Sequence, residues 1–122
     1  MGRERIMVGR FGENAALEFL KRKRYRVMER NFRTPFGEID IVARKDGLIV
    51  FLEVKTRLTS SLGPPYLSVT GLKQRHLTRS ALAYLKWRGL LDAPARIDVV
   101  SVKLNCGYRV EGIEIIENAV EG

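Results

Sequence analysis

The order of predicted helices and strands places this protein in the α/β class. Residues 36–57 are typical of a β-hairpin, because two runs of β-branched and apolar residues flank the turn-forming pair Asp46-Gly47. A stretch with the helical spacing of apolar residues and then a strand-like run precede this hairpin. A second helical stretch and then two strand-like runs follow it. The predicted order is α-β-β-β-α-β-β, with the third strand parallel to the fourth through a right-handed crossover. We therefore expect a mixed five-stranded sheet with a helix packed on either side.

The length and composition of the chain fit a single domain covering residues 1–122. A chain of 122 residues, 45% of them hydrophobic, can bury one core but not two. No apolar run approaches the roughly 20 residues of a membrane span, and the N-terminus lacks the apolar core of a signal peptide. The single cysteine, Cys106, excludes an internal disulfide framework. We expect a cytoplasmic protein that makes no contact with a membrane.

The charge balance is strongly basic. Twenty-two Lys and Arg residues against 14 Asp and Glu give a formal net charge of +8 and a pI near 10.1. Such a balance is typical of proteins that meet nucleic acid or another anionic surface. Solubility alone is the alternative explanation, because many basic proteins make no specific use of their charge.

The first predicted helix runs from about Gly9 to Lys23, and residues 1–8 are expected to be a loose start. Its apolar stripe is formed by Ala16, Leu17 and Leu20. Glu13 lies on the same face by helical spacing. It is either a first-turn acid favoured by the helix dipole or a carboxylate that points towards a functional site. Gly12 lies close to this face and would allow a near approach of the backbone.

The two-residue loop of the hairpin fixes the register of its strands, 39–43 and 48–54, so that facing residues sum to 93. Asp40 then faces Glu53, Glu38 faces Lys55, and all four side chains emerge on one side of the sheet. Two facing carboxylates repel each other, and a divalent cation would remove that repulsion. Their hard oxygen ligands suit Mg²⁺ or Mn²⁺. The alternative is a solvated strand face in which Glu38 and Lys55 form an ordinary ion pair.

The remaining elements complete the predicted order. Strands are expected at residues 25–32, 96–104 and 108–116, a long loop at 56–70 and a second helix at 71–88. Gly89 would stop the second helix, and Thr70 is its expected N-cap. Asp98, inside the fourth strand, is expected to be a hydrogen-bonded structural acid. Residues 117–122 are expected to be loose, with their acids facing solvent.

Several motifs, taken together, resemble the YraN-like family of uncharacterised bacterial proteins over about Gly9 to Val102. They are G-R-F-G-E-N-A-A, R-N-F-R, G-E-I-D-I-V, F-L-E-V-K-T-R, V-T-G-L-K-Q-R with A-L-A-Y-L, and R-I-D-V-V-S-V. More broadly, a helix with Glu13, then Asp40, then Glu53-Val54-Lys55, resembles the PD-(D/E)XK nuclease superfamily with its three-layer, restriction-endonuclease-like fold. The layout is also similar to archaeal Holliday-junction resolvases. One departure is Ile39, which stands before Asp40 where the superfamily has proline.

The resemblance implies a metal-dependent nuclease centre. Asp40 and Glu53 would be ligands of Mg²⁺ or Mn²⁺, with the Val54 carbonyl completing the shell. Lys55 would be the catalytic lysine, and Glu13 the helix-borne acid that assists the metal site. The implied activity is an endonuclease acting on branched or otherwise structured DNA. Cutting two strands of a junction would favour a homodimer.

The basic residues would hold a nucleic-acid backbone by charge without reading its sequence. The candidates are Arg33, Arg57, Lys73, Arg75 and Arg79. Two other hypotheses stay open. One is a nucleic-acid-binding module that keeps the nuclease fold but cuts slowly or not at all. The other is a basic partner of an acidic protein or of RNA, in which the carboxylates belong to a satisfied ion-pair network.

Overall fold

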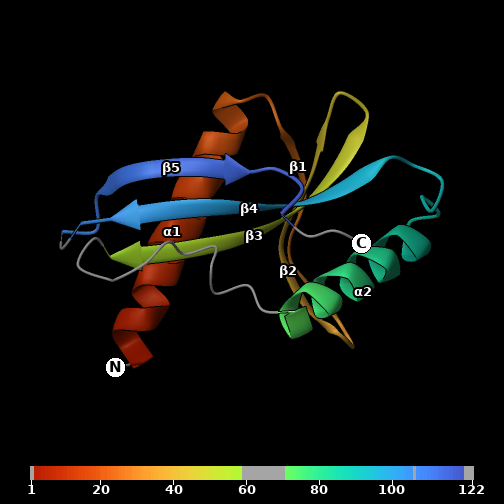
Figure 1. Ribbon diagram of the computed structural model, residues 1–122. Helices are drawn as coiled ribbons and strands as arrows, with labels where there is room; N and C mark the ends of the chain where they lie inside the picture. Colours follow the sequence, from red (N-terminus) through yellow and green to blue (C-terminus); the bar gives the residue numbers. More distant parts are fainter. Residues whose placement is uncertain (1, 59–70, 106, 120–122) are drawn as a thin grey trace.

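The computed structural model describes residues 2–58, 71–105 and 107–119, with side chains described from residue 6 in the first segment and from residue 75 in the second. It contains two helices and five strands in the predicted order (Figure 1). They are α1 (Gly2–Arg22), β1 (Arg26–Thr34), β2 (Gly37–Lys45), β3 (Leu48–Leu58), α2 (Gly71–Trp87), β4 (Ala95–Leu104) and β5 (Val110–Ile116). The α/β class and the element order are confirmed.

All five strands form one mixed sheet in the order β1-β2-β3-β4-β5. β3 and β4 are parallel, and the other neighbouring pairs are antiparallel. The parallel pair requires a crossover, and α2 lies in the connection between its two strands. Figure 1 shows α1 crossing β3, β4 and β5, whereas α2 lies beside β1 and β2. The predicted mixed sheet is therefore confirmed.

Two hydrophobic clusters lie on opposite faces of this sheet. The α1-side cluster joins α1 to the inward residues of the central strands, among them Leu20, Ile41, Leu52 and Val100. The α2-side cluster joins α2 to the alternate residues, among them Tyr84, Val42 and Phe51. Since residues adjacent in a strand point to opposite faces, β2 and β3 are apolar on both faces and are covered by a helix on each.

The hairpin between β2 and β3 has the predicted turn and the predicted register. Asp46 and Gly47 have φ angles of 50° and 82°, as a two-residue turn with two left-handed residues requires. Regular pairing runs from Lys45↔Leu48 to Ile41↔Leu52, and each of these pairs sums to 93. Beyond Ile41↔Leu52 the strands part: β2 curves away with β1 towards α2, whereas β3 continues beside β4 (Figure 1). Asp40 and Glu53 are the first residues past that point.

The alternation of side chains in β2 breaks at Asp40. Ile41 packs in the α1-side cluster and Ile39 in the α2-side cluster, although residues two apart in a regular strand share a face. The paired strand β1 shows the same reversal around Asn31, which has a left-handed φ of 51°. Asp40 therefore lies at a local twist of the sheet, where the adjacent residues Asp40 and Ile41 both lie on the α1 side.

The described residues near both ends of the chain, 2–8 and 117–119, were expected to be loose but have defined structure. α1 begins at Gly2 rather than Gly9, so residues 2–8 add two helical turns to the predicted helix. Its first turns contain good helix formers, and Val8 packs against the α1-side cluster. At the other end, Ala119 N–H donates to the Ile97 carbonyl at 3.0 Å, so residues 117–119 are fixed against β4. Met1, residues 59–70 with the expected N-cap Thr70, and residues 120–122 lie outside the described residues.

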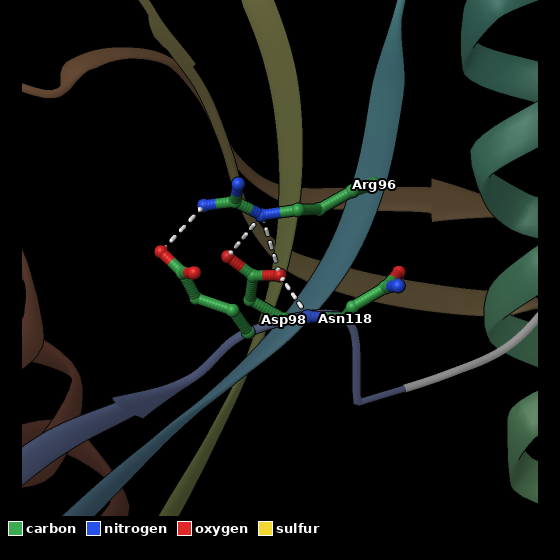
Figure 2. Close-up of polar contacts among 4 residues, drawn as sticks. Arg96, Asp98 and Asn118 are labelled. Atoms are coloured by element: carbon green, nitrogen blue, oxygen red, sulfur yellow. Dashed lines mark hydrogen bonds and ion pairs between the residues drawn. The ribbon is translucent and has the colours of Figure 1, made fainter.

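Asp98 is the hydrogen-bonded structural acid that was expected. Its fully buried carboxylate accepts from Arg96 Nε at 2.9 Å and from the Asn118 N–H at 2.8 Å (Figure 2). Arg96 also pairs with Glu117, with 3.2 Å between Nη2 and Oε1. This network ties the segment after β5 to β4. Neither described helix combines the length and apolar character needed to cross a membrane.

Candidate functional site

A cleft of about 630 Å³ opens on the α1 side of the sheet, next to the point where β2 and β3 part. Its lining comes from α1, β2 and β3: Ile6, Val8, Gly9, Arg10, Glu13, Asp40, Val54, Lys55, Thr56, Arg57 and Leu58. Four residues of the predicted metal and catalytic centre, Glu13, Asp40, Val54 and Lys55, are therefore brought together in one cleft. Glu53 lies beside it, next to Val54.

Asp40 occupies the narrow end of the gap between the strands. Its Oδ2 accepts a hydrogen bond from the Val54 N–H at 2.8 Å, so the carboxylate takes the place that a partner strand would have filled. Burial, followed by the negative charge of Glu53, raises the pKa of Asp40 to about 7, although the hydrogen bond from the Val54 N–H opposes the shift. Glu13 and Glu38 add smaller contributions that also raise it. The acidic cluster thus makes its own ionisation unfavourable.

Glu53 and Lys55 form an ion pair at the edge of this cluster. The Glu53 residue is only 7% exposed, and Lys55 Nζ lies 3.6 Å from its Oε1. Lys55 is itself largely buried, so the ammonium group has limited access to water. A cation held there by the fold can stabilise negative charge more strongly than an exposed lysine would.

Glu13 reaches the cleft from α1, on the apolar face predicted for it. Its Oε1 accepts from Arg30 Nη2 at 3.2 Å and from Asn31 Nδ2 at 3.3 Å. α1 can approach β3 closely because residue 12 is glycine: a β-carbon at Gly12 would overlap the Thr56 side chain. The predicted close approach at Gly12 is therefore confirmed, and it brings Glu13 within electrostatic range of Asp40.

The chemistry of these donors fits a divalent cation. Asp40 and Glu53 supply hard carboxylate oxygens, and a cation between them would offset the repulsion that now favours protonated Asp40. Among the described residues, no three Asp, Glu, His or Cys side chains gather closely enough to form a metal cage by themselves. Mg²⁺ commonly uses one or two carboxylates and retains several waters, so two acids suffice.

The ion pairs of Glu38 differ from expectation. Glu38 faces Arg33 across β1 and β2, and its Oε2 lies 3.4 Å from Arg33 Nε. Lys55 pairs with Glu53, and a Glu38–Lys55 pair is not found among the ion pairs of the described side chains. The cause is the parting of the strands, which ends regular pairing before Glu38 could face Lys55.

The basic residues predicted to hold a nucleic acid are only partly gathered at the cleft. Arg57 lines it. Arg75 is exposed on α2, and the guanidinium carbon of Arg79 lies 5.8 Å from the centre of the Phe36 ring. Arg33 is exposed at the end of β1, where it pairs with Glu38. The side chain of Lys73 lies outside the described part of the chain.

A family model described as uncharacterised protein family UPF0102 matches residues 12–102 of this chain. The chain belongs to the UPF0102 family. It is 48% identical over 114 residues to a UPF0102 protein of Geotalea uraniireducens (strain Rf4), covering 93% of this chain and 89% of the relative. A UPF0102 protein of Desulfosudis oleivorans (strain DSM 6200 / JCM 39069 / Hxd3) is 48% identical over 118 residues, covering 97% and 93%. One of Moorella thermoacetica (strain ATCC 39073 / JCM 9320) is 48% identical over 111 residues, covering 91% and 92%.

The predicted YraN-like resemblance is thereby confirmed as UPF0102 membership. In this UPF0102 protein, the matched span contains Glu13, Asp40, Glu53 and Lys55. Three residues of the site were not assigned a role from the sequence: Arg10, which lines the cleft, and Arg30 and Asn31, which hold Glu13. The R-N-F-R motif contains two of them and was the available signal. Their role depends on the twist at Asn31, which periodicity does not reveal.

Proposed function

We propose that this UPF0102 protein is a Mg²⁺- or Mn²⁺-dependent DNA endonuclease of the PD-(D/E)XK type, with a restriction-endonuclease-like fold, acting on branched or otherwise structured DNA. The observation that carries the proposal is the acidic cluster where β2 and β3 part. Asp40 and Glu53 are drawn together there despite their repulsion, with Lys55 Nζ 3.6 Å from Glu53. A basic protein with such a cluster fits the chemistry of a phosphodiester substrate.

Each residue of the site has a distinct part in this proposal. Asp40 and Glu53 would hold the metal ion, and the Val54 carbonyl would supply a further oxygen. The bound ion would supply Lewis-acid chemistry, polarising the phosphodiester and lowering the pKa of water. Lys55 positions that water or stabilises charge developing on the phosphate oxygens. Glu13 assists from α1, held by Arg30 and Asn31.

The basic residues outside the metal site serve to bind DNA and do not take part in its cleavage. Arg10 and Arg57 line the cleft beside the acids, where they would contact backbone phosphates. Such contacts carry no sequence information, which suits a nuclease that recognises the shape of its DNA. A substrate with two strands to cut would be served by a homodimer, with one site for each strand.

The test is a cleavage panel over linear, nicked, flapped and four-way DNA with Mg²⁺ or Mn²⁺. Asp40→Asn and Lys55→Ala should abolish cleavage while DNA binding persists, because they remove a ligand and the catalytic ammonium but leave the basic surface intact. The matched controls are Asp92→Asn and Lys103→Ala, which change exposed residues of the same types. Cleavage by Asp40→Asn at the wild-type rate would show that the activity belongs to a contaminant or to another site.

A second candidate function is a nucleic-acid-binding module with the same fold and no catalysis. It is favoured by the contacts that the acids make within the protein, since Asp40 accepts a hydrogen bond from the Val54 N–H and Glu53 pairs with Lys55. A thermal shift scan distinguishes the two. Millimolar Mn²⁺ should raise the Tm of the wild type but not that of Glu53→Gln if the metal site exists. No shift in either protein, together with salt-dependent DNA binding, would favour the binding module.

A further inference from the structure

A second pocket lies on the other face of the sheet, between β1, β2 and the residues that follow α2. It has a volume of about 450 Å³, and the described residues that line it are all basic or apolar: Arg26, Val27, Met28, Arg44, Arg88 and Leu90. Arg44 follows Val42 of the α2-side cluster by two residues, which places it on the α2 face, away from the cleft. We propose that this arginine pocket binds a phosphate group.

The first argument is the direct opposition of two like charges. Arg26 and Arg44 are Cα partners in the antiparallel pairing of β1 and β2. Opposed residues in such a pair have Cβ atoms about 4.5–5.5 Å apart, and like charges there destabilise the sheet. A phosphate between the two guanidinium groups would replace this repulsion with charge-assisted hydrogen bonds, for which the planar fork of arginine is suited.

The third arginine is positioned by the end of α2. Gly89, with a left-handed φ of 68°, terminates the helix, and Arg88 immediately precedes it. The Arg88 guanidinium carbon lies 5.6 Å from the centre of the Trp87 ring, and Nη1 lies 3.9 Å from Glu29 Oε1. One nearby carboxylate cannot neutralise three guanidinium groups, so the arginine pocket keeps a net positive charge.

The shape of the arginine pocket depends on an irregularity in β1. The register with β2 shifts between Val27 and Glu29, which makes Met28 the extra residue of a β-bulge. A bulge bends its strand and changes the direction of neighbouring side chains, and bulges often occur beside functional sites. Met28 lines the pocket, so the bulge forms part of its wall.

The phosphate bound here would not be the one that is cleaved. Arg44 is four residues from Asp40 along β2, a separation of roughly 13 Å at about 3.3 Å per residue, and the two pockets open on opposite faces. The arginines are exposed, which suits the backbone of a polyanion better than a small buried ligand. The assignment of this phosphate to DNA rests on the proposed function. The binding of a phosphate group by the arginine pocket does not depend on that function. A branched DNA could place one arm at each pocket.

The test uses the full chain in EDTA, so that no cleavage is involved. Arg44→Gln and Arg26→Gln are compared with Arg109→Gln, which changes an exposed arginine in the turn before β5. Binding to a labelled duplex and to a four-way junction is measured as a function of salt. Each pocket substitution should weaken binding severalfold and reduce the slope of log K against log[salt] by roughly 0.9 for each lost phosphate contact. Arg109→Gln should leave the slope unchanged.

Inorganic phosphate distinguishes a free phosphate from a backbone phosphate. A Tm increase with sodium phosphate over sodium chloride at equal ionic strength, lost in Arg44→Gln without a change in DNA binding, would support the pocket and assign it to a free phosphate. Loss of DNA binding without such an increase would assign it to the backbone. Arg44→Gln should also raise the Tm at low salt, because it removes a like-charge pair. Unchanged DNA binding together with an unchanged response to phosphate would overturn the proposal, whatever the cleavage panel shows.

Discussion

Asp40 in β2 and Asp98 in β4 are both aspartates inside the sheet, but their surroundings differ. Asp98 is met by an arginine side chain and a backbone N–H, and it fixes the segment after β5 (Figure 2). Asp40 accepts a hydrogen bond from the Val54 backbone N–H, and the neighbouring carboxylates of Glu53, Glu13 and Glu38 raise its pKa. Burial raises the pKa of both groups, but only Asp98 has an arginine that opposes the shift. Burial alone therefore does not identify a functional acid; the nature of its neighbours does.

The comparison is tested most strongly by removing the charge of each aspartate in turn. We expect Asp40→Asn to lower cleavage by roughly 10³-fold or more, because loss of a metal ligand costs several kcal/mol of transition-state stabilisation. Asp98→Asn should lower the amount of folded protein while leaving cleavage per folded molecule near the wild-type value. Cleavage rates normalised to the folded fraction, measured by near-UV circular dichroism, give the result. Equal losses for both variants would remove the distinction between them.

The second prediction concerns the network around Asp98. Asp98→Ala leaves Arg96 without its main partner inside the protein, so we expect the free energy of unfolding to fall by about 3 kcal/mol or more. Urea unfolding measures this loss. The control is Arg96→Met combined with Asp98→Leu, which removes both charges and should recover much of the stability. A double variant as unstable as Asp98→Ala would mean that backbone contacts, such as that of Asn118, dominate the network.

In the third prediction, removing the charge of an aspartate increases stability instead of lowering it, because the negative charge of Asp40 is unfavourable in the absence of metal. The pKa of Asp40 rises from 3.8 to about 7 in the folded protein. Between pH 3.8 and about pH 7, Asp40 is therefore protonated in the folded state but ionised in the unfolded state. The resulting stabilisation is complete below pH 4 and is lost as the pH rises through about 7. Asp40→Asn keeps an oxygen for the Val54 N–H but cannot ionise.

We therefore expect Asp40→Asn to become progressively more stable than the wild type between pH 5 and pH 8 in EDTA, reaching on the order of 1–3 kcal/mol. Urea unfolding at several pH values provides the measurement, with Asp92→Asn as the control that should track the wild type. A wild type that gains stability relative to Asp40→Asn as the pH rises would show that Asp40 is stabilised in its charged form.

Part of this contrast was accessible from the sequence. The Asp46-Gly47 turn fixed the register as far as Ile41↔Leu52, which brought Asp40 and Glu53 close together, and the isolated position of Asp98 in an apolar strand indicated a structural acid. The face reversal at Asp40 was not accessible, because periodicity assumes regular strands, whereas Asn31 in the paired strand has a left-handed φ of 51°.

The arginine pocket was missed for a related reason. Arg26 and Arg44 face each other only through the register of β1 and β2, which passes through a bulge at Met28. The sequence contains a run of basic residues there, but charge runs are most often solvated. The start of α1 at Gly2 was missed because residues 1–8 were expected to be a loose, basic start, whereas residues 2–8 are helical and Val8 packs against the α1-side cluster.

The smallest expected effect concerns the competition between a proton and a metal ion for the Asp40 carboxylate. A carboxylate with a pKa near 7 must lose its proton before it can bind a cation, so metal binding competes with protonation. We expect the apparent affinity for Mn²⁺, from thermal shift titrations, to increase by up to about tenfold between pH 6 and pH 7 and to level off above pH 8. In Asp40→Asn the dependence on pH should disappear together with most of the affinity, while Asp92→Asn should behave as the wild type. An affinity that does not vary over this range would mean that Mn²⁺ binds elsewhere, because a ligand at Asp40 cannot escape this competition.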